Sequence, residues 1–142
     1  MKILLVVSVA FASIFTLSAQ DKNAIKGEWF NEEKEGRIEI SEENGKFYGK
    51  LIWLKEPKED GKPKTDKNNP DKSKRDRPLK GLRILEGFEY KNGSWENGEI
   101  YDPKSGKTYS CIMKLKNRDT LEVRGYVGIS LIGRTTTWTR AD

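Results

Sequence analysis

Residues 124–140 read RGYVGISLIGRTTTWTR, and this stretch decides the fold that we expect. Its β-branched residues, Val127, Ile129, Ile132 and residues 135–137, suit a pleated and half-buried strand. Glycines recur through the same stretch, as expected where strands bend sharply or backbones approach closely. The pattern predicts the last turn and the last strand of a closed antiparallel sheet.

Arginine and tryptophan lie together near the end of this stretch, at Arg134, Trp138 and Arg140. A guanidinium can lie on an indole face while its N–H groups bind open carbonyl groups. A tryptophan is also present near the start of the chain, in Gly27-Glu28-Trp29. We therefore expect Trp29 to meet Arg134 or Arg140, so that the first and last strands pair and close the sheet.

Short strand patterns separated by turn signals fill the chain between these ends, with no helical period. Asn44-Gly45 and Asn92-Gly93 predict tight hairpins, and Asn97-Gly98 predicts a bulge. Alternation places Phe47 and Trp53 on one face of their strand. The predicted fold is all-β, a single antiparallel up-and-down barrel of about eight strands that can hold one small ligand.

The first residues have the order of a secretory signal. Lys2 precedes an apolar run over residues 3–17, and small residues follow. The run is shorter than the roughly 20 apolar residues of a membrane anchor. We predict that residues 1–19 are a signal peptide cleaved after Ala19. Residues 20–142 then form one exported domain, periplasmic or secreted, without a membrane span.

A long lysine- and proline-rich segment, residues 55–80, separates two of the predicted strands. It exceeds the length of about 12–15 residues at which a structureless connection becomes unusual. Its four prolines argue against a regular strand or helix. Ten basic and six acidic residues give it a net charge of +4. The mature chain, without Lys2, also carries +4, so the loop holds the whole excess of positive charge.

The residue types that are missing argue against several functions. The chain has no histidine, which excludes Ser-His-Asp and Cys-His nucleophiles and disfavours zinc or haem sites. Its one cysteine, Cys111, allows no internal disulfide, and we expect a core thiol there. The basic loop lacks aromatic residues on which nucleic-acid bases stack. We predict neither an enzyme nor a cofactor, and no nucleic-acid partner.

Several motifs occur in one order along nearly all of the chain after residue 26. They are Gly27-x-Trp29, Tyr48-Gly49-Lys50-Leu51-Ile52-Trp53, Asn69-Pro70-Asp71, Arg75-x-Arg77-Pro78-Leu79-x-Gly81, Tyr101-Asp102-Pro103-x-x-Gly106-Lys107-x-Tyr109, Leu121-x-Val123-Arg124-Gly125-Tyr126-x-Gly128 and Leu131-x-Gly133-Arg134-x-x-x-Trp138. Together they resemble a family of small exported bacterial proteins catalogued as domain of unknown function 2147. The resemblance implies a lipocalin-like (calycin-like) barrel and brings no established activity.

Aromatic and arginine side chains near the predicted barrel ends are candidate ligand-binding residues. They are Trp29, Trp53, Arg75, Arg77, Arg124, Tyr126, Arg134 and Trp138. Arg75 and Arg77 suit a carboxylate or phosphate, although binding carbonyl groups of the barrel rim and fixing the loop is the favoured alternative. If Arg134 points inward, its charge needs a carboxylate, a ligand anion or the Trp29 ring. Stacking is the favoured interpretation.

Asp66, Asn68, Asn69 and Asp71 offer oxygen atoms at spacings that suit calcium. Their order is not that of an EF-hand loop, and Asx turns are the commoner use of such residues. We therefore predict no metal site.

Two classes of function remain. In the first, the barrel is a binding module for a small apolar or amphipathic ligand, including an anionic amphipath, in the cell envelope. In the second, the protein is a non-enzymatic structural or interaction protein with a filled barrel. Its cationic loop would then contact acidic envelope components such as anionic lipid headgroups. A hollow or a filled interior separates the two.

Overall fold

The structure is a computed structural model that describes residues 2, 6–10 and 21–142. Most of the predicted signal peptide, residues 1–19, and its cleavage site after Ala19 lie outside the described residues, so export stays a prediction. Within the described residues, no helix has both the length and the apolar character that crossing a bilayer requires.

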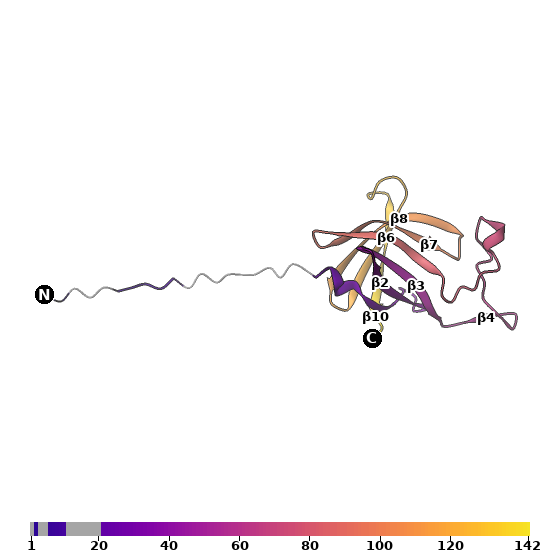
Figure 1. Ribbon diagram of the computed structural model, residues 1–142, viewed down its shortest axis with the longest axis horizontal. Helices are drawn as coiled ribbons and strands as arrows, with labels where there is room; N and C mark the ends of the chain where they lie inside the picture. The colour runs from indigo at the N-terminus through magenta and orange to yellow at the C-terminus, as the bar shows by residue number, and fades with distance from the viewer. Residues whose placement is uncertain (1, 3–5, 11–20) are drawn as a thin grey trace.

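Eight antiparallel strands form a closed barrel, in the order β1-β10-β9-β8-β7-β6-β3-β2 (Figure 1). Two further short strands, β4 and β5, form a small separate hairpin. The barrel strands are β1 (Gly27–Phe30), β2 (Gly36–Glu43), β3 (Lys46–Leu54), β6 (Arg83–Lys91), β7 (Ser94–Asp102), β8 (Lys107–Asn117), β9 (Thr120–Tyr126) and β10 (Gly133–Arg140). The hairpin in the long loop consists of β4 (Lys58–Glu59) and β5 (Lys62–Pro63). The predicted all-β closed barrel is confirmed.

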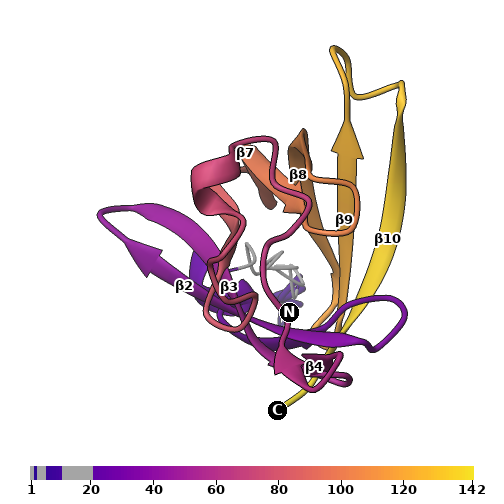
Figure 2. The ribbon, with the colours of Figure 1, turned by 90° about the vertical axis from the view of Figure 1, so that its right-hand side faces the viewer.

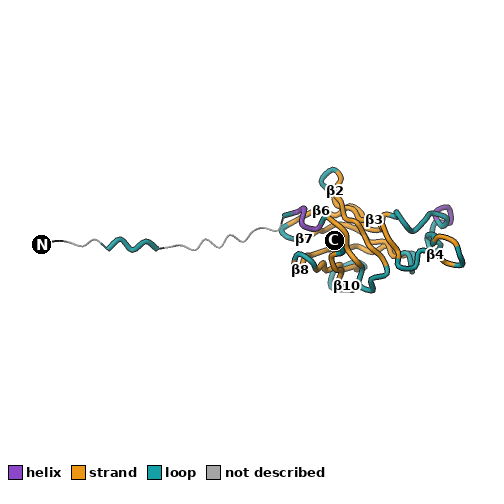
Figure 3. Tube along the Cα trace, turned by 90° about the horizontal axis from the view of Figure 1, so that it is seen from below, coloured by secondary structure: helices purple, strands orange, loops and turns teal. Residues whose placement is uncertain are grey.

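The up-and-down order gives the barrel two unlike ends. The connections over residues 31–35, 55–82, 103–106 and 127–132 lie at one end, which we call the mouth. The tight turns between β2 and β3, β6 and β7, and β8 and β9 lie at the other, closed end. Figure 3 places two short 3-10 helices at these opposite ends. They are η1 (Lys22–Ile25), at the closed end, and η2 (Lys72–Lys74), in the long loop.

The first and last strands meet as the sequence predicts, and Arg140 makes the contact. Trp29 pairs with Arg140 across β1 and β10, and the guanidinium lies 4.2 Å from the centre of the indole ring. Arg140 also donates to the carbonyl oxygens of Ala24 at 2.7 Å and Lys26 at 3.0 Å. The same residue therefore joins the last strand to the first and fixes η1 across the closed end.

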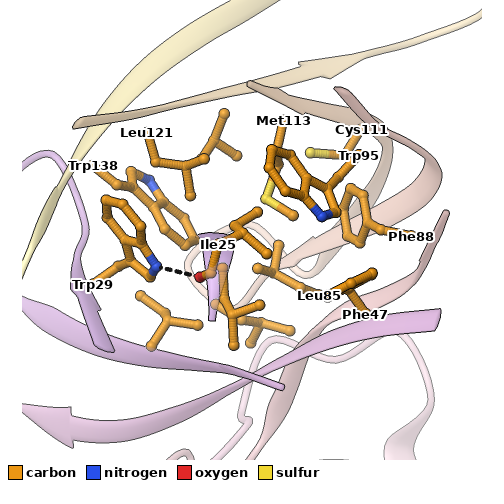
Figure 4. Packing of buried hydrophobic residues seen from close by; sticks show 14 of the residues in the cluster. Ile25, Trp29, Phe47, Leu85, Phe88, Trp95, Cys111, Met113, Leu121 and Trp138 are labelled. Atoms are coloured by element: carbon orange, nitrogen blue, oxygen red, sulfur yellow. Dashed lines mark hydrogen bonds between the residues drawn. The ribbon is translucent and has the colours of Figure 1, made fainter. Parts of the chain in front are cut away.

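The closed half of the barrel is filled by a packed apolar core (Figure 4). Ile25 of η1 is fully buried there and accepts a hydrogen bond from the Trp29 indole N–H at 2.9 Å. Phe88 lies directly on the backbone of Gly98, where a Cβ would be 2.4 Å from the ring. The buried core residues lie between positions 25 and 138, so residues 21–142 carry all the strands and core residues that the structure describes.

The predicted turns are present, since Asn44 and Asn92 adopt the positive φ angles of tight hairpins. The pairing of β7 with β8 is irregular between Trp95 and Gly98, which confirms the predicted bulge. Two placements expected from the sequence were wrong. A register shift between β2 and β3 leaves Ile52 as an extra residue, so Trp53 lies on the outside of the barrel. Val127, expected in a half-buried strand, is 68% exposed beyond the end of β9.

Candidate ligand-binding site at the barrel mouth

Above the packed core, a cavity of about 960 Å³ opens at the mouth, lined by barrel strands and by the connections around the rim. Its apolar walls come from β2, β3, β6, β7 and β10, with one further leucine from the long loop. They are Ile38, Leu51, Leu54, Leu79, Ile84, Ile100 and Trp138. Binding sites for small molecules are typically concave, mostly apolar and about 300–1,000 Å³ in volume. The interior is thus filled at one end and hollow at the other.

The rim of this cavity is charged, and most of its charges are paired. Lys104 lies 2.6 Å from Glu35, which joins the β7–β8 turn to the β1–β2 connection. Lys67 lies 2.6 Å from Glu59 within the long loop. The rim also carries Lys55 and Lys58, both exposed, and within the described residues neither has a carboxylate within 4 Å. These two ammonium groups are free to bind an anionic group of a ligand.

A buried carboxylate fixes the long loop to the barrel. Asp66 is fully buried and accepts hydrogen bonds from the Tyr101 hydroxyl at 2.5 Å, the Asn69 amide at 2.8 Å and the Arg77 guanidinium at 3.1 Å. Tyr101 belongs to β7, whereas the other three residues belong to the loop. The loop is therefore an ordered cover beside the mouth (Figure 2).

The same network sets the charge state of its members. Burial acts to raise the pKa of Asp66, but the hydrogen bonds from Tyr101, Asn69 and Arg77 outweigh it and hold the pKa below the usual 3.8. Burial, together with the bond to Asp66, raises the pKa of Tyr101 to about 12. The cover is consequently held by a carboxylate anion and a neutral phenol at neutral pH.

A second contact holds the loop against the β7–β8 turn. The Asn68 side-chain amide donates to the carbonyl oxygens of Pro103 and Lys104, each at 3.1 Å. Gly106 has a φ of +72°, and a Cβ there would collide with the Asn68 carbonyl oxygen at 1.9 Å. Only glycine allows this approach.

Two of the predicted ligand-binding residues line the cavity. Trp138 is 4% exposed and contributes to its wall. Arg134 lies at the rim, with its side chain 80% exposed and 3.9 Å from Glu32. The predicted stacking of Arg134 on Trp29 was wrong, because Arg134 is the second residue of β10 and lies at the mouth, whereas Trp29 contacts Arg140 at the closed end. Trp29 is fully buried in the core and has no access to the cavity.

Trp53 belongs to an aromatic cluster on the outer surface. Its ring packs edge-on against Phe30 at 6.0 Å between centres, and the Arg37 guanidinium lies 5.2 Å from the Trp53 ring. A separate hollow of about 350 Å³ lies beside Trp53, lined also by Leu54 and by prolines and lysines of the loop. Trp53 is therefore not placed to bind a ligand inside the barrel.

The two loop arginines bind groups of the loop itself. The Arg75 Nε donates to the Asn69 carbonyl at 2.7 Å, and Arg77 binds Asp66. They fix the loop, as favoured from the sequence, but through loop atoms and not through carbonyl groups of the barrel rim. The side chains of Asn69 and Asp71 each accept a hydrogen bond from the backbone N–H two residues further on, as in Asx turns. Among the described residues, no three acidic, cysteine or histidine side chains are grouped to hold a metal.

Arg124 and Tyr126 lie at the base of the β9–β10 hairpin and not among the residues that line the cavity. Arg124 donates to the Ser130 carbonyl at 2.7 Å and to the Thr135 hydroxyl at 2.9 Å. The arginine is thus committed to the hairpin tip.

Comparison with known proteins agrees with this architecture. A family model described as "Uncharacterized protein conserved in bacteria (DUF2147)" matches residues 27–140. The chain belongs to this family. The chain is also similar to a solved structure described as "Protein HP1028 from the human pathogen Helicobacter pylori belongs to the lipocalin family", with a TM-score of 0.72, 29% identity and a match that covers 82% of each chain. The comparison with curated proteins found no match.

The lipocalin-like barrel of this DUF2147 member is a fold suited to binding small molecules. Sequence reasoning missed most of the cavity wall, including Ile38, Ile84 and Ile100. These residues look like ordinary core positions in the strand pattern. Ile38 and Ile84 belong to the buried core and Ile100 packs against it, and nothing local in the sequence shows that the cavity begins at these residues.

Proposed function

We propose that the protein is a non-enzymatic binding module of the bacterial cell envelope. It holds one small amphipathic molecule in the mouth of the barrel. The apolar part of that molecule lies against the wall formed by Ile38, Ile84, Ile100 and Trp138. Its polar end, an anion, lies at the rim near Lys55 and Lys58. The cell-envelope location rests on the predicted signal peptide.

The single observation that carries the proposal is the open, apolar upper half of a barrel whose lower half is packed. A filled barrel would favour the alternative of a purely structural protein, and the cavity argues against it. The lipocalin-like fold and the uncharacterised family also favour binding over catalysis. The described rim carries equal numbers of acidic and basic side chains, but its two cations without a carboxylate partner, Lys55 and Lys58, lie close together in the long loop, which favours an anionic headgroup there.

The proposal is tested by titrating the protein with a fluorescent long-chain fatty-acid analogue. We expect saturable binding with one site per chain, and competition by unlabelled fatty acid. The Ile100→Trp substitution fills part of the cavity. It should weaken binding about tenfold or more, because the new ring occupies space that the ligand needs.

The matched control is Glu99→Trp, which adds the same ring to the neighbouring, exposed position of β7. This variant should bind the analogue as the unmodified protein does. Equal loss of binding in both variants, or no loss in either, would refute a site inside the barrel. The Lys55→Gln and Lys58→Gln pair should reduce affinity for the fatty acid more than for the corresponding alcohol, since only the acid carries an anion.

A further inference from the structure

The connection between β9 and β10 is an apolar tip that stands free of the barrel. Val127, Ile129, Leu131 and Ile132 are 68%, 57%, 85% and 66% exposed. Among the described residues, the other large hydrophobic side chains exposed in this way are Val6, Val7 and Val9, which precede the domain. Single exposed apolar residues are ordinary, but four within six residues mark a contact surface.

The hairpin projects beyond the rest of the folded domain. In Figure 2 it forms the highest part of the view, between the ends of β9 and β10, and it is also uppermost in the domain in Figure 1. The glycine at position 128 has a φ of +78°, which allows the tight bend there. The tip can therefore insert into a neighbouring surface while the barrel stays outside it.

The backbone of the tip is already hydrogen-bonded within the hairpin. Arg124 donates to the carbonyl oxygens of Ser130 at 2.7 Å and Leu131 at 3.4 Å. The N–H groups of Ile129 and Ile132 bind the carbonyl oxygens of Val127 and Ile129, both at 3.1 Å. This matters because unsatisfied backbone groups make entry into hydrocarbon costly.

The charges next to the tip on β9 and β10 are positive, although Arg134 is paired with Glu32 at 3.9 Å. Residues 123–138 contain no Asp or Glu, and their two charged residues are Arg124 and Arg134. Lys107 begins β8 three residues before Ser110, the partner of Tyr126, so it lies beside the hairpin. Lys107 is exposed, and within the described part of the chain it has no carboxylate within 4 Å.

The long loop at the same end of the barrel lies apart from the tip (Figure 2) and is also positively charged. The exposed lysines Lys62, Lys72, Lys74 and Lys80 have no carboxylate within 4 Å among the described residues. The half-buried Tyr126 lies at the base of the tip, a position typical of aromatic residues at a membrane interface. An apolar tip flanked by Arg124, Arg134 and Lys107 matches an anionic lipid surface better than a protein surface, where charge is depleted around an apolar centre.

We propose that residues 127–132 insert into the surface of an anionic phospholipid bilayer, while arginine and lysine side chains at the mouth bind the headgroups. The insertion is shallow, because Arg124 at the base of the tip stays at headgroup depth. This docking surface rests on the hairpin and its charges and is independent of the proposed ligand site.

The test is flotation of residues 21–142 with vesicles of phosphatidylcholine, with and without about one third phosphatidylglycerol. This segment is used because the apolar run over residues 3–17 would itself bind lipid. We expect binding to the anionic vesicles that weakens with added salt. The double variant Ile129→Asp and Leu131→Asp should bind at least about tenfold more weakly.

The matched control is Asn92→Asp with Asn117→Asp, which adds the same two charges to turns at the closed end and should retain binding. Far-ultraviolet circular dichroism establishes that both double variants are folded. Equal binding by both double variants would overturn the proposal. So would failure of the unmodified segment to float with anionic vesicles. A dimer in sedimentation that the Ile129→Asp and Leu131→Asp variant abolishes, without any vesicle binding, would assign the tip to a second copy instead.

Discussion

Replacing Asp66 by asparagine should release the loop from the mouth while leaving the barrel folded. The substitution keeps the size of the side chain but removes the carboxylate that accepts hydrogen bonds from Tyr101, Asn69 and Arg77. The asparagine amide has one oxygen that can accept hydrogen bonds, and its NH2 group is itself a donor. At least one of the three donors, for example the Arg77 guanidinium, therefore loses its acceptor.

The magnitude follows from the burial of the site. Asp66 is fully buried, and removing one member of a buried charged pair typically costs about 3–5 kcal/mol. Arg77 is partly exposed and water can solvate it, so we expect the lower figure, about 3 kcal/mol. Because each 1.4 kcal/mol is tenfold, the open population of the loop should rise roughly a hundredfold.

Limited trypsin digestion measures this opening directly, since Lys72 and Lys74 lie in the loop. If the loop recloses faster than trypsin cleaves it, cleavage there should become roughly a hundredfold faster in the Asp66→Asn variant. Asp60→Asn is the control: it makes the same chemical change at an exposed position of the same loop. Unchanged cleavage in Asp66→Asn, or equal acceleration in both variants, would refute the role given to Asp66.

The pH dependence provides an independent check. The pKa of Asp66 is lowered in the folded protein, so its contribution is complete above the unfolded value near 3.8. It is lost as the pH falls below that value and passes the folded pKa. The difference in thermal stability between the unmodified protein and Asp66→Asn should therefore shrink below about pH 3.8. A difference that stays constant into acid would contradict the assignment.

Two further predictions concern the closed end and the core. Arg140→Met removes the guanidinium that contacts Trp29 and the carbonyl groups of Ala24 and Lys26. It should lower the free energy of unfolding in urea by about 3 kcal/mol. A change under about 0.5 kcal/mol would show that the closure is not stabilising. Burial raises the pKa of the Cys111 thiol to about 12, so a maleimide should label Cys111 only after denaturation, and rapid labelling of the native protein would contradict the packed core.

Much of the fold could be predicted from the sequence because its signals are local. Asn-Gly pairs require positive φ angles, and the β-branched residues favour strands wherever the chain later packs. The meeting of Trp29 with Arg140 could also be predicted, since the first and last strands of a closed barrel must pair. The choice between Arg134 and Arg140 needed the direction of β10 relative to η1, which no local pattern contains.

The site was harder to predict because small irregularities decide it. One extra residue, Ile52, reverses the alternation at the end of β3 and moves Trp53 to the outer surface. The depth to which η1 and the large core side chains fill the barrel sets where the cavity begins. The partnership of Asp66 with Tyr101 spans 35 residues and joins a loop to a strand, so spacing alone gives no hint of it.

The central claim, that the hollow upper half of the barrel binds an amphipathic molecule, is tested most directly by isoleucine methyl NMR during titration with a long-chain fatty acid. Ile38, Ile84 and Ile100 line the cavity, whereas Ile40 is buried in the core away from it. We predict saturable shifts at the three cavity residues, reached at one ligand per chain, and little change at Ile40. No shift at the cavity residues, or shifts confined to the exposed tip at residues 127–132, would contradict the account.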